Sequence, residues 1–285
     1  MNQATKTIVL IHGLWMTPRS WDLFREFYQT QGYQVFTPAW PHIDGEVEAI
    51  RRNPSALAGV GIAEVVDHYA KFIRLLDEPP ILIGHSFGGL IVQLLLDRGL
   101  GAAGIAIDSA TPKGIWKLPF SAIVSVSPVL LNPLNYWRTV ALTFKQFKSA
   151  FADIMPEIEA RSAYDRDAIP GPGRPVFQVA LANFNPWAAT KVNYHNHNRS
   201  PLLLIGGAKD RLVPAVQNQI NYQKYARSRA VTDYKEFPHR SHLIVAQEGW
   251  QEVAECALTW AQSQAMTEMH VPLRVLTGER EIQMG

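Results

Sequence analysis

The chain has 285 residues and is poor in several features that mark particular protein classes. It contains one cysteine, Cys256, which excludes an internal disulfide framework. The formal net charge is only +2, too small to provide a field for holding nucleic acid or an anionic membrane. The longest apolar stretches, near Ile81 and Leu202, are far shorter than the roughly 20 residues that cross a bilayer. We therefore expect a protein with no nucleic-acid partner and no membrane span.

The amino terminus also lacks the features of a secretory signal. Met1 to Lys6 lead into an apolar run at Ile8 without a basic region, a hydrophobic segment and a cleavage site. We therefore expect a cytoplasmic protein. Hydrophobic residues make up 47% of the chain and charged residues 18%, as in water-soluble globular proteins. This length suits one domain with an insertion or a tail better than two unrelated domains.

Short apolar runs alternate with amphipathic helical segments along most of the chain. The runs that we interpret as strands are Thr7–Ile11, Gln34–Thr37, Ile81–Ile83, Gly104–Ile107, Leu202–Ile205 and Thr232–Phe237. We expect helices to begin at Pro18, at Pro214 and near Gly249, the last ending at about Gln264. This alternation predicts an α/β fold with a mostly parallel, doubly wound sheet flanked by helices.

The alternation stops between Ala110 and Arg199, where proline and aromatic residues become frequent. We interpret residues 111–198 as an α-helical cap inserted after the strand that ends near Asp108, with residues 1–110 and 199–264 forming the core. Such an insertion leaves the sheet at the carboxyl end of a strand, where open α/β folds bind ligands. The alternative is an additional helical layer with no role in binding. Residues 265–285 form either a terminal arm or a disordered tail.

Ser86 occupies the centre of a Gly84-His85-Ser86-Phe87-Gly88 motif, between a predicted buried strand and a predicted helix. A serine at such a junction makes a sharp turn that only glycines leave room for, and the turn exposes its hydroxyl to a cleft. Ser86 is therefore our candidate nucleophile. A phosphate loop is excluded, because the motif lacks the lysine and the serine or threonine that bind phosphate and magnesium.

A serine hydroxyl is a poor nucleophile at neutral pH and needs a base, which a carboxylate orients. Asp210 follows a predicted buried strand and a glycine turn, and His242 lies in a loop after the next strand. The order Ser, Asp, His is that of the α/β-hydrolase arrangement. His239 is an alternative base, and Asp108, which also ends a strand, is an alternative acid.

Four motifs resemble those of serine hydrolases with the α/β-hydrolase fold, over about Lys6 to Gln264. They are His12-Gly13-Leu14-Trp15, Gly84-His85-Ser86-Phe87-Gly88, Gly207-Ala208-Lys209-Asp210 and Ser241-His242-Leu243. The resemblance implies Ser86 as nucleophile, Asp210 as acid and His242 as base, with an oxyanion hole formed by the backbone N–H groups of Leu14 and Phe87. The chain begins directly at the strand before His12, so we expect the leading antiparallel strands of larger family members to be absent.

Several other residues have simpler interpretations. Trp15 either walls the acyl pocket or packs beneath the cap. His195 and His197 have alternate-residue spacing but no nearby cysteine or acidic partner, so we expect no metal site there. Cys256 lies on an apolar helix face and is expected to be a packed thiol.

The expected activity is hydrolysis of carboxylic esters through an acyl-serine intermediate, with thioesters and lactones in the same range and no cofactor required. The aromatic cap favours a small apolar or aromatic substrate. The fold hosts many reactions, so carbon–carbon bond cleavage or hydroxynitrile lysis is an alternative; the His12-Gly13-x-Trp15 loop also resembles that of plant methyl esterases and hydroxynitrile lyases. A third possibility is a ligand-binding protein without turnover. The sequence leaves the oligomeric state open.

Overall fold

A six-stranded, fully parallel sheet forms the centre of the molecule in the computed structural model, which describes residues 5–43 and 45–269. Its strands are β1 (Thr7–Ile11), β2 (Gln34–Phe36), β3 (Ile81–His85), β4 (Ala103–Ile107), β7 (Leu202–Gly207) and β8 (Thr232–Phe237), in the order β2-β1-β3-β4-β7-β8. Every neighbouring pair is parallel. The predicted α/β fold is confirmed, and within the described residues no antiparallel strand joins this sheet.

The four inner strands, β1, β3, β4 and β7, are buried along their whole length, as their continuous apolar sequences predict. Alternate side chains point to opposite faces, which divides the core into two clusters. Ile8 and Ile83 belong to one cluster, whereas Val9 and Leu82 belong to the other. A sheet packed on both faces holds the ends of its strands rigidly, and these ends carry the candidate site.

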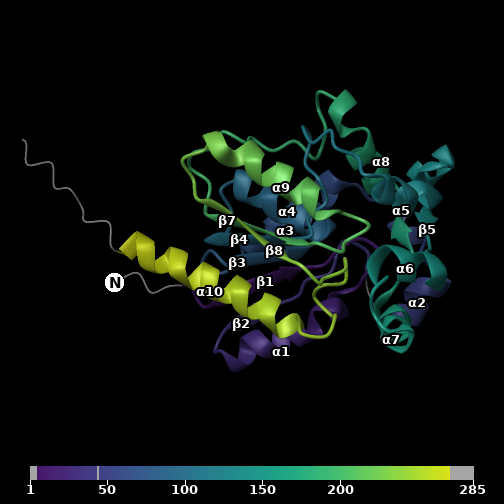
Figure 1. Ribbon diagram of the computed structural model, residues 1–285, viewed down its shortest axis with the longest axis horizontal. Helices are drawn as coiled ribbons and strands as arrows, with labels where there is room; N and C mark the ends of the chain where they lie inside the picture. Colours follow the sequence, from purple (N-terminus) through teal and green to yellow (C-terminus); the bar gives the residue numbers. More distant parts are fainter. Residues whose placement is uncertain (1–4, 44, 270–285) are drawn as a thin grey trace, which may run out of the picture.

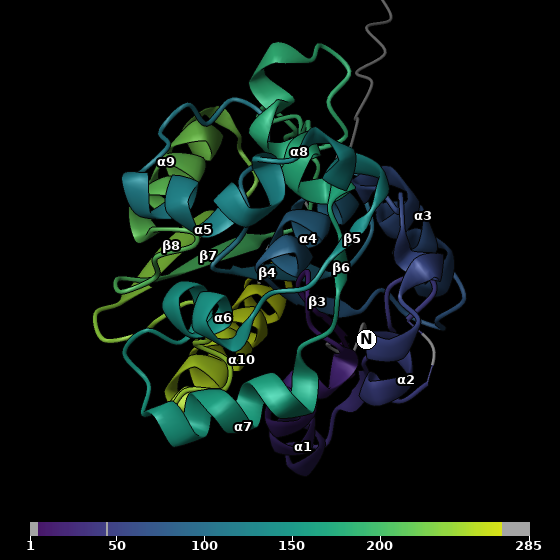
Figure 2. The same cartoon turned by 90° about the vertical axis from the view of Figure 1, so that its right-hand side faces the viewer.

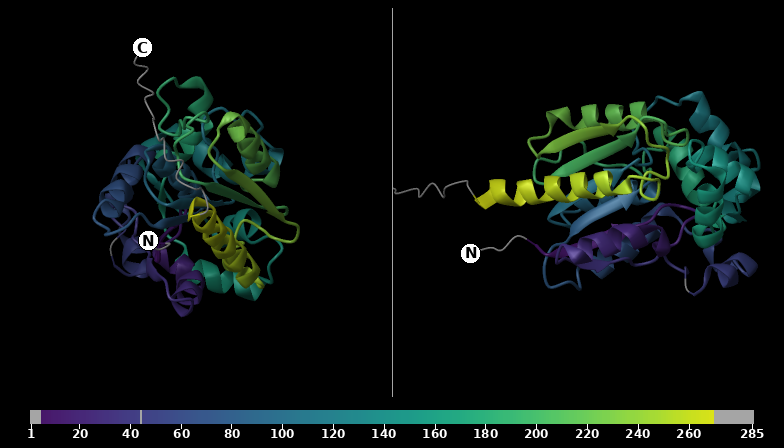
Figure 3. Two further views of the ribbon diagram at one scale, coloured as in Figure 1. Left: turned by 90° about the vertical axis from the view of Figure 1, so that its left-hand side faces the viewer. Right: turned by 60° about the horizontal axis from the view of Figure 1, so that its bottom comes forward.

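Helices cover both faces of the sheet (Figures 1 and 3). On one face lie α1 (Asp22–Thr30) and α10 (Trp250–Met269), and on the other lie α3 (Ile62–Ile73), α4 (Phe87–Asp97) and α9 (Ala215–Lys224). The helix expected from Pro18 begins as a 3-10 turn, Pro18–Trp21, before α1. α10 continues to Met269, beyond the end that we expected near Gln264, and residues 270–285 of the predicted tail lie outside the described residues.

Residues 111–198 lie beyond the carboxyl ends of the strands and form a layer of their own there (Figures 1 and 2). Their elements are α5 (Phe120–Leu130), η3 (Pro133–Trp137), β5 (Thr139–Val140), α6 (Phe144–Phe151), α7 (Glu157–Asp167), β6 (Gly171–Pro172), α8 (Arg174–Ala180) and η4 (Ala182–Phe184). β5 and β6 pair antiparallel. The short helix α2 (Val47–Arg52) lies next to this layer in Figure 2. Among the helices of the described residues, none is both long enough and apolar enough to cross a membrane.

Candidate active site

Ser86 lies at the junction of β3 and α4 in a strained backbone conformation, with φ 57° and ψ −121°. The glycines on either side are required by close approach of the backbone. A Cβ atom on Gly84 would lie 2.1 Å from the carbonyl oxygen of Gly88, and one on Gly88 would lie 2.0 Å from that of Ile11. The motif therefore folds as predicted, with Ser86 immediately before the first residue of α4.

Ser86, His242 and Asp210 form one series of hydrogen bonds. His242 Nδ1 lies 2.6 Å from Asp210 Oδ2, and His242 Nε2 lies 3.0 Å from Ser86 Oγ. An ionised carboxylate only accepts hydrogen bonds, so Nδ1 carries the proton and Nε2 offers its lone pair to the serine hydroxyl. All three side chains are buried. The structure thus brings together three residues that lie far apart in the sequence.

The carboxylate of Asp210 is held in place by backbone donors as well. Its Oδ1 accepts from the N–H groups of Leu212 at 2.7 Å and Val213 at 2.8 Å, which leaves Oδ2 directed at His242. The glycine turn after β7 makes this geometry possible, since a Cβ on Gly207 would lie 2.7 Å from the carbonyl oxygen of Arg240.

Asp108, the alternative acid, has a different environment. Its Oδ1 accepts from the N–H of Gly207 at 2.6 Å, and its Oδ2 has no hydrogen-bond partner among the described residues. Burial, and secondarily the charge of Asp210, raise the pKa of Asp108 well above its usual value. No hydrogen bond joins Asp108 to His242. His239, the alternative base, is exposed, and its carbonyl oxygen accepts from Gln247.

The loop that carries His242 is fixed from two sides. His85 Nε2 donates to the carbonyl oxygen of His242 at 2.7 Å, and burial, with the neighbouring His242, holds the pKa of His85 well below its usual value. From the 111–198 layer, the ring of Phe151 meets that of His242 edge-on, with 4.9 Å between centroids. The carbonyl oxygen of Phe151 also accepts from the N–H of Leu243 at 2.8 Å. The imidazole therefore has little freedom to turn away from Ser86.

His12 orients the loop after β1. Its Nδ1 donates to the carbonyl oxygen of Gly13 at 2.9 Å, while its Nε2 accepts from the N–H of Trp40 at 3.1 Å. Burial lowers the pKa of His12 to about 4, so the ring is neutral near pH 7. In a trans peptide unit the C=O and N–H point in opposite directions, so holding the Gly13 carbonyl also fixes the N–H of Leu14. Within the described residues, neither Leu14 nor Phe87 uses its N–H in a hydrogen bond.

Trp15 contacts the 111–198 layer and also lines the cavity at Ser86. Its indole Nε1 donates to the carbonyl oxygen of Val140 at 2.9 Å, and its own carbonyl oxygen accepts from Ile169 at 2.9 Å, which ties the loop to the 111–198 layer. Its ring also lines the cavity at Ser86. The left-handed backbone of Trp15, with φ 65°, is held by these contacts.

Ser86 opens into an apolar cavity of about 140 Å³ between the sheet and the 111–198 layer. Its walls come from α5, α8 and the loop after Asp210, and they include Ala122, Val126, Val179 and Leu212. Only Ser86, Thr111 and Gln217 contribute polar side chains. Ser86 thus lines a cavity that is otherwise almost entirely apolar.

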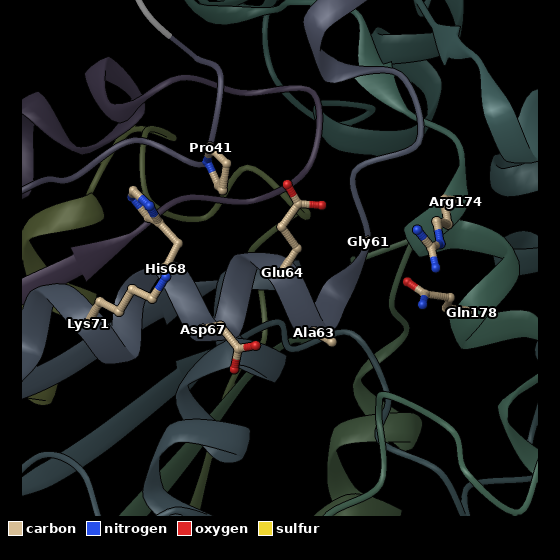
Figure 4. A pocket seen from close by; sticks show the side chains of 9 residues that line it. All are labelled: Pro41, Gly61, Ala63, Glu64, Asp67, His68, Lys71, Arg174 and Gln178. Atoms are coloured by element: carbon tan, nitrogen blue, oxygen red, sulfur yellow. The ribbon is translucent and has the colours of Figure 1, made fainter.

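A larger cavity, of about 550 Å³, lies on the outside between α3 and α8 (Figure 4). Several charged side chains line it, including Glu64, Asp67, Lys71 and Arg174. Ser86 does not line it. By size alone this cavity would be the stronger candidate for a substrate site. The hydrogen bonds among Ser86, His242 and Asp210, however, lie at the smaller cavity.

One group of residues within the described chain has a geometry that could hold a metal ion: His85, Asp108 and His242. Both ring nitrogens of His242 are hydrogen-bonded already, so a metal would have to displace Ser86 or Asp210. His195 and His197 are exposed and do not belong to this group. Cys256 is partly buried against the core, and this burial raises the pKa of its thiol.

The comparison with known families agrees with this geometry. Residues 8–256 match the alpha/beta hydrolase family. The chain belongs to this family. Membership supports a hydrolase, and the predicted resemblance is confirmed at the level of the family. No curated protein matches the sequence.

Solved structures of this family share the fold at low sequence identity. A monoacylglycerol lipase from Paleococcus ferrophilus has a TM-score of 0.61 at 18% identity, over 92% of this chain and 96% of that one. A methylesterase from Arabidopsis has a TM-score of 0.63 at 13% identity, over 90% and 99%. Tomato methylketone synthase I, complexed with 2-tridecanone, has a TM-score of 0.67 at 13% identity, over 92% and 100%.

Three residues at the site had no individual role in our sequence analysis. His12 was singled out only as part of its motif, and His85 only as a letter inside the serine motif. Phe151 was one of many aromatic residues in the insertion. For His12 and His85, the sequence signal was their position directly beside a glycine of a recognised motif. Nothing in the sequence marked Phe151, because its contact with His242 joins two segments about 90 residues apart.

Proposed function

We propose that this protein hydrolyses carboxylic esters through an acyl intermediate on Ser86. The observation that carries the proposal is the buried series of hydrogen bonds from Ser86 through His242 to Asp210, at 3.0 and 2.6 Å. In the first step, His242 Nε2 takes the hydroxyl proton while Ser86 Oγ attacks the ester carbonyl carbon. Asp210 holds the ring in the required tautomer and stabilises the imidazolium that forms.

The tetrahedral intermediate then collapses, and His242 passes its proton to the leaving alcohol. A water molecule, activated by the same imidazole, attacks the acyl-serine and releases the carboxylic acid. The N–H groups of Leu14 and Phe87 are the proposed donors to the oxyanion in both steps. The site at the amino end of α4 supports this role for Phe87, because the helix dipole adds positive potential there.

The cavity at Ser86 limits the group that can be bound there. An apolar cavity of about 150 Å³ holds roughly one benzene ring, and this cavity measures about 140 Å³. We propose a small apolar or aromatic group on the acyl or alcohol side, with thioesters and lactones of similar shape in the same range. In this proposal residues 111–198 act as a lid that excludes water, and a larger substrate requires α5 or α8 to move.

The test is steady-state hydrolysis of short p-nitrophenyl esters by the parent protein and by Ser86→Ala. We expect turnover by the parent and a loss of about 10⁴-fold or more in the variant, because the nucleophile is gone. The variant should fold like the parent, since Ser86 Oγ has a single hydrogen bond, to His242. Equal rates in the two proteins would refute the proposal.

Product analysis separates the other two activities. Cleavage of a cyanohydrin or a diketone without ester hydrolysis would assign the same three residues to non-hydrolytic chemistry. Failure with every substrate class, in a protein that still binds apolar ligands, would indicate a binding protein. The intact series of hydrogen bonds favours turnover over this last possibility.

A further inference from the structure

Exposed apolar side chains are concentrated on one part of the molecule. Seventeen large apolar side chains are exposed among the described residues, and only four of them, Leu75, Val216, Tyr222 and Val231, lie outside residues 111–198. Most of the others come from residues 116–137 and 181–187, and we call their exposed apolar side chains the apolar cap face. A concentration of this kind marks an interaction surface rather than ordinary surface exposure.

The apolar cap face is rich in aromatic residues. Its aromatic members are Trp116, Phe120, Trp137, Phe184 and Trp187, and the exposed fractions of Phe120 and Trp187 are 81% and 87%. Such rings lose little conformational entropy when they are buried, and tryptophan is typical of the boundary between water and lipid.

The two stretches that form this face lie side by side. The ring centroids of Trp116 and Phe184 are 5.6 Å apart, and Asn183 Oδ1 accepts from the N–H of Gly114 at 2.7 Å. α5 contacts both η3 and α8, and η4 contacts α8. Figure 2 looks directly onto this layer, with α5 and α8 toward the viewer. The exposed rings therefore belong to one connected layer.

The two sequence stretches that include this face carry charges of one sign only. No aspartate or glutamate occurs within residues 111–152 or 168–209. The cations Lys117, Arg138 and Lys191 are exposed, and none of them forms an ion pair with a described acidic residue. The net charge of +2 for the whole chain conceals this local excess.

The cavity at Ser86 opens toward the same face. Leu118 and Ile123 line the cavity, and their exposed fractions are 60% and 47%, so each has one side inside and one side outside. An apolar molecule that enters between them would pass from this face to Ser86 without crossing a polar surface.

We propose that the apolar cap face binds the surface of an anionic lipid bilayer, with its aromatic rings in the interface and its cations against the lipid head groups. Given the ester hydrolysis proposed above, the substrates are then esters dissolved in that lipid. Charge complementarity favours this partner over a second copy of the chain, because two copies would place cations of the same sign against each other. In this proposal a local group of cations attracts the membrane, whereas the expectation of no such binding considered only the net charge.

The test is co-sedimentation of Ser86→Ala with vesicles of phosphatidylcholine alone and of phosphatidylcholine with phosphatidylglycerol. Ser86→Ala is used because it leaves the vesicle lipids intact, so binding is measured independently of turnover. We expect partition onto the anionic vesicles that weakens with added salt. Adding Phe120→Ser and Trp187→Ser should reduce this partition about tenfold or more, because two exposed rings no longer enter the interface. Adding Lys117→Glu and Arg138→Glu should remove the preference for anionic vesicles.

A matched control is the same protein with Leu75→Ser and Val231→Ser, which removes two exposed apolar side chains outside residues 111–198 and should not change the partition. Lack of partition onto either vesicle would overturn the proposal, as would an equal loss in the control. A dimer in sedimentation analysis that Phe120→Ser and Trp187→Ser dissociate would assign the face to a second copy instead. A protein without esterase activity that still bound the vesicles would refute the proposed function and support this surface.

Discussion

Two carboxyl groups lie at the carboxyl edge of the sheet, and their contacts separate their roles. Asp210 is hydrogen-bonded to His242, whereas Asp108 is bonded only to the N–H of Gly207. In the sequence each follows a buried strand, and only the glycine turn before Asp210 favoured that residue as the acid. The decisive difference is the turn after β7, which directs one oxygen of Asp210 at the imidazole.

We therefore expect Asp210→Asn and Asp108→Asn to differ sharply in kcat. Asn at position 210 would favour the wrong tautomer of His242, and the loss should be on the order of 10⁴-fold. Asn at position 108 keeps an oxygen for the N–H of Gly207 and should retain most of the activity. Measuring kcat for ester hydrolysis by both variants tests this difference. A larger loss of kcat in Asp108→Asn than in Asp210→Asn would identify Asp108 as the acid.

Asp108→Asn should also change the dependence of stability on pH. Burial raises the pKa of Asp108 in the folded protein, so above its ordinary pKa of 3.8 the folded state retains a proton that the unfolded state has lost. This difference destabilises the parent increasingly as pH rises from 3.8. We expect Asp108→Asn to be more stable than the parent at neutral pH, with the advantage shrinking toward pH 3.8.

Urea unfolding of the two proteins at several pH values measures this effect. Lys71→Gln, a surface change on α3, serves as a control whose difference from the parent should vary little with pH. A constant difference between Asp108→Asn and the parent across this range would contradict the raised pKa.

At the level of elements, the junction of β3 and α4 depends on backbone atoms that nearly touch. A Cβ on Gly88 would lie 2.0 Å from the carbonyl oxygen of Ile11, so α4 could not keep its position against β1. We expect Gly88→Ala to cost several kcal/mol of stability or to prevent folding, in the range of severe core defects.

The control for this prediction is Gly99→Ala. Gly99 has a φ of 73° and nothing within 4 Å of its Cβ position, so the substitution should cost only about 1 kcal/mol of backbone strain. Thermal unfolding of both variants provides the comparison. Similar melting temperatures would mean that β3 and α4 can separate more easily than the structure indicates.

The strands of the core were the most predictable elements, because a strand buried on both faces must be apolar along its whole length. Their boundaries were within one residue of the predicted ones, except that β3 and β7 each extend two residues further toward the site. Those additional residues include Gly84 and Gly206. Because glycine is typical of turns, the sequence did not indicate that these two residues belong to strands.

The end of the strand-helix alternation after Ala110 was visible in the sequence, but the structure within residues 111–198 was not predictable. β5 and β6 are two residues long, too short to produce an alternating pattern, and α5 contains Pro128, which normally ends a helix. Its aromatic residues divide between buried positions such as Phe147 and exposed ones such as Phe120. Local sequence does not distinguish these positions, because burial depends on which segments meet in space.

At the scale of the whole molecule, the sheet and the 111–198 layer position different parts of the candidate site. The sheet fixes the ends of β3 and β7 and thereby the positions of Ser86 and Asp210. In the layer, the ring of Phe151 contacts that of His242, and α5 and α8 contribute apolar walls of the cavity. The same layer carries most of the exposed apolar surface. In our proposals an apolar route of access leads through this layer to the polar residues at Ser86.

Covalent labelling shows whether His242 and Asp210 activate Ser86 as a nucleophile. The folded protein would be treated with a fluorophosphonate, digested, and its peptides identified by mass spectrometry. We predict one adduct per chain, on Ser86, formed far more slowly in His242→Ala and absent in Ser86→Ala. An unlabelled Ser86 in the folded parent, or equal labelling in His242→Ala, would contradict the account.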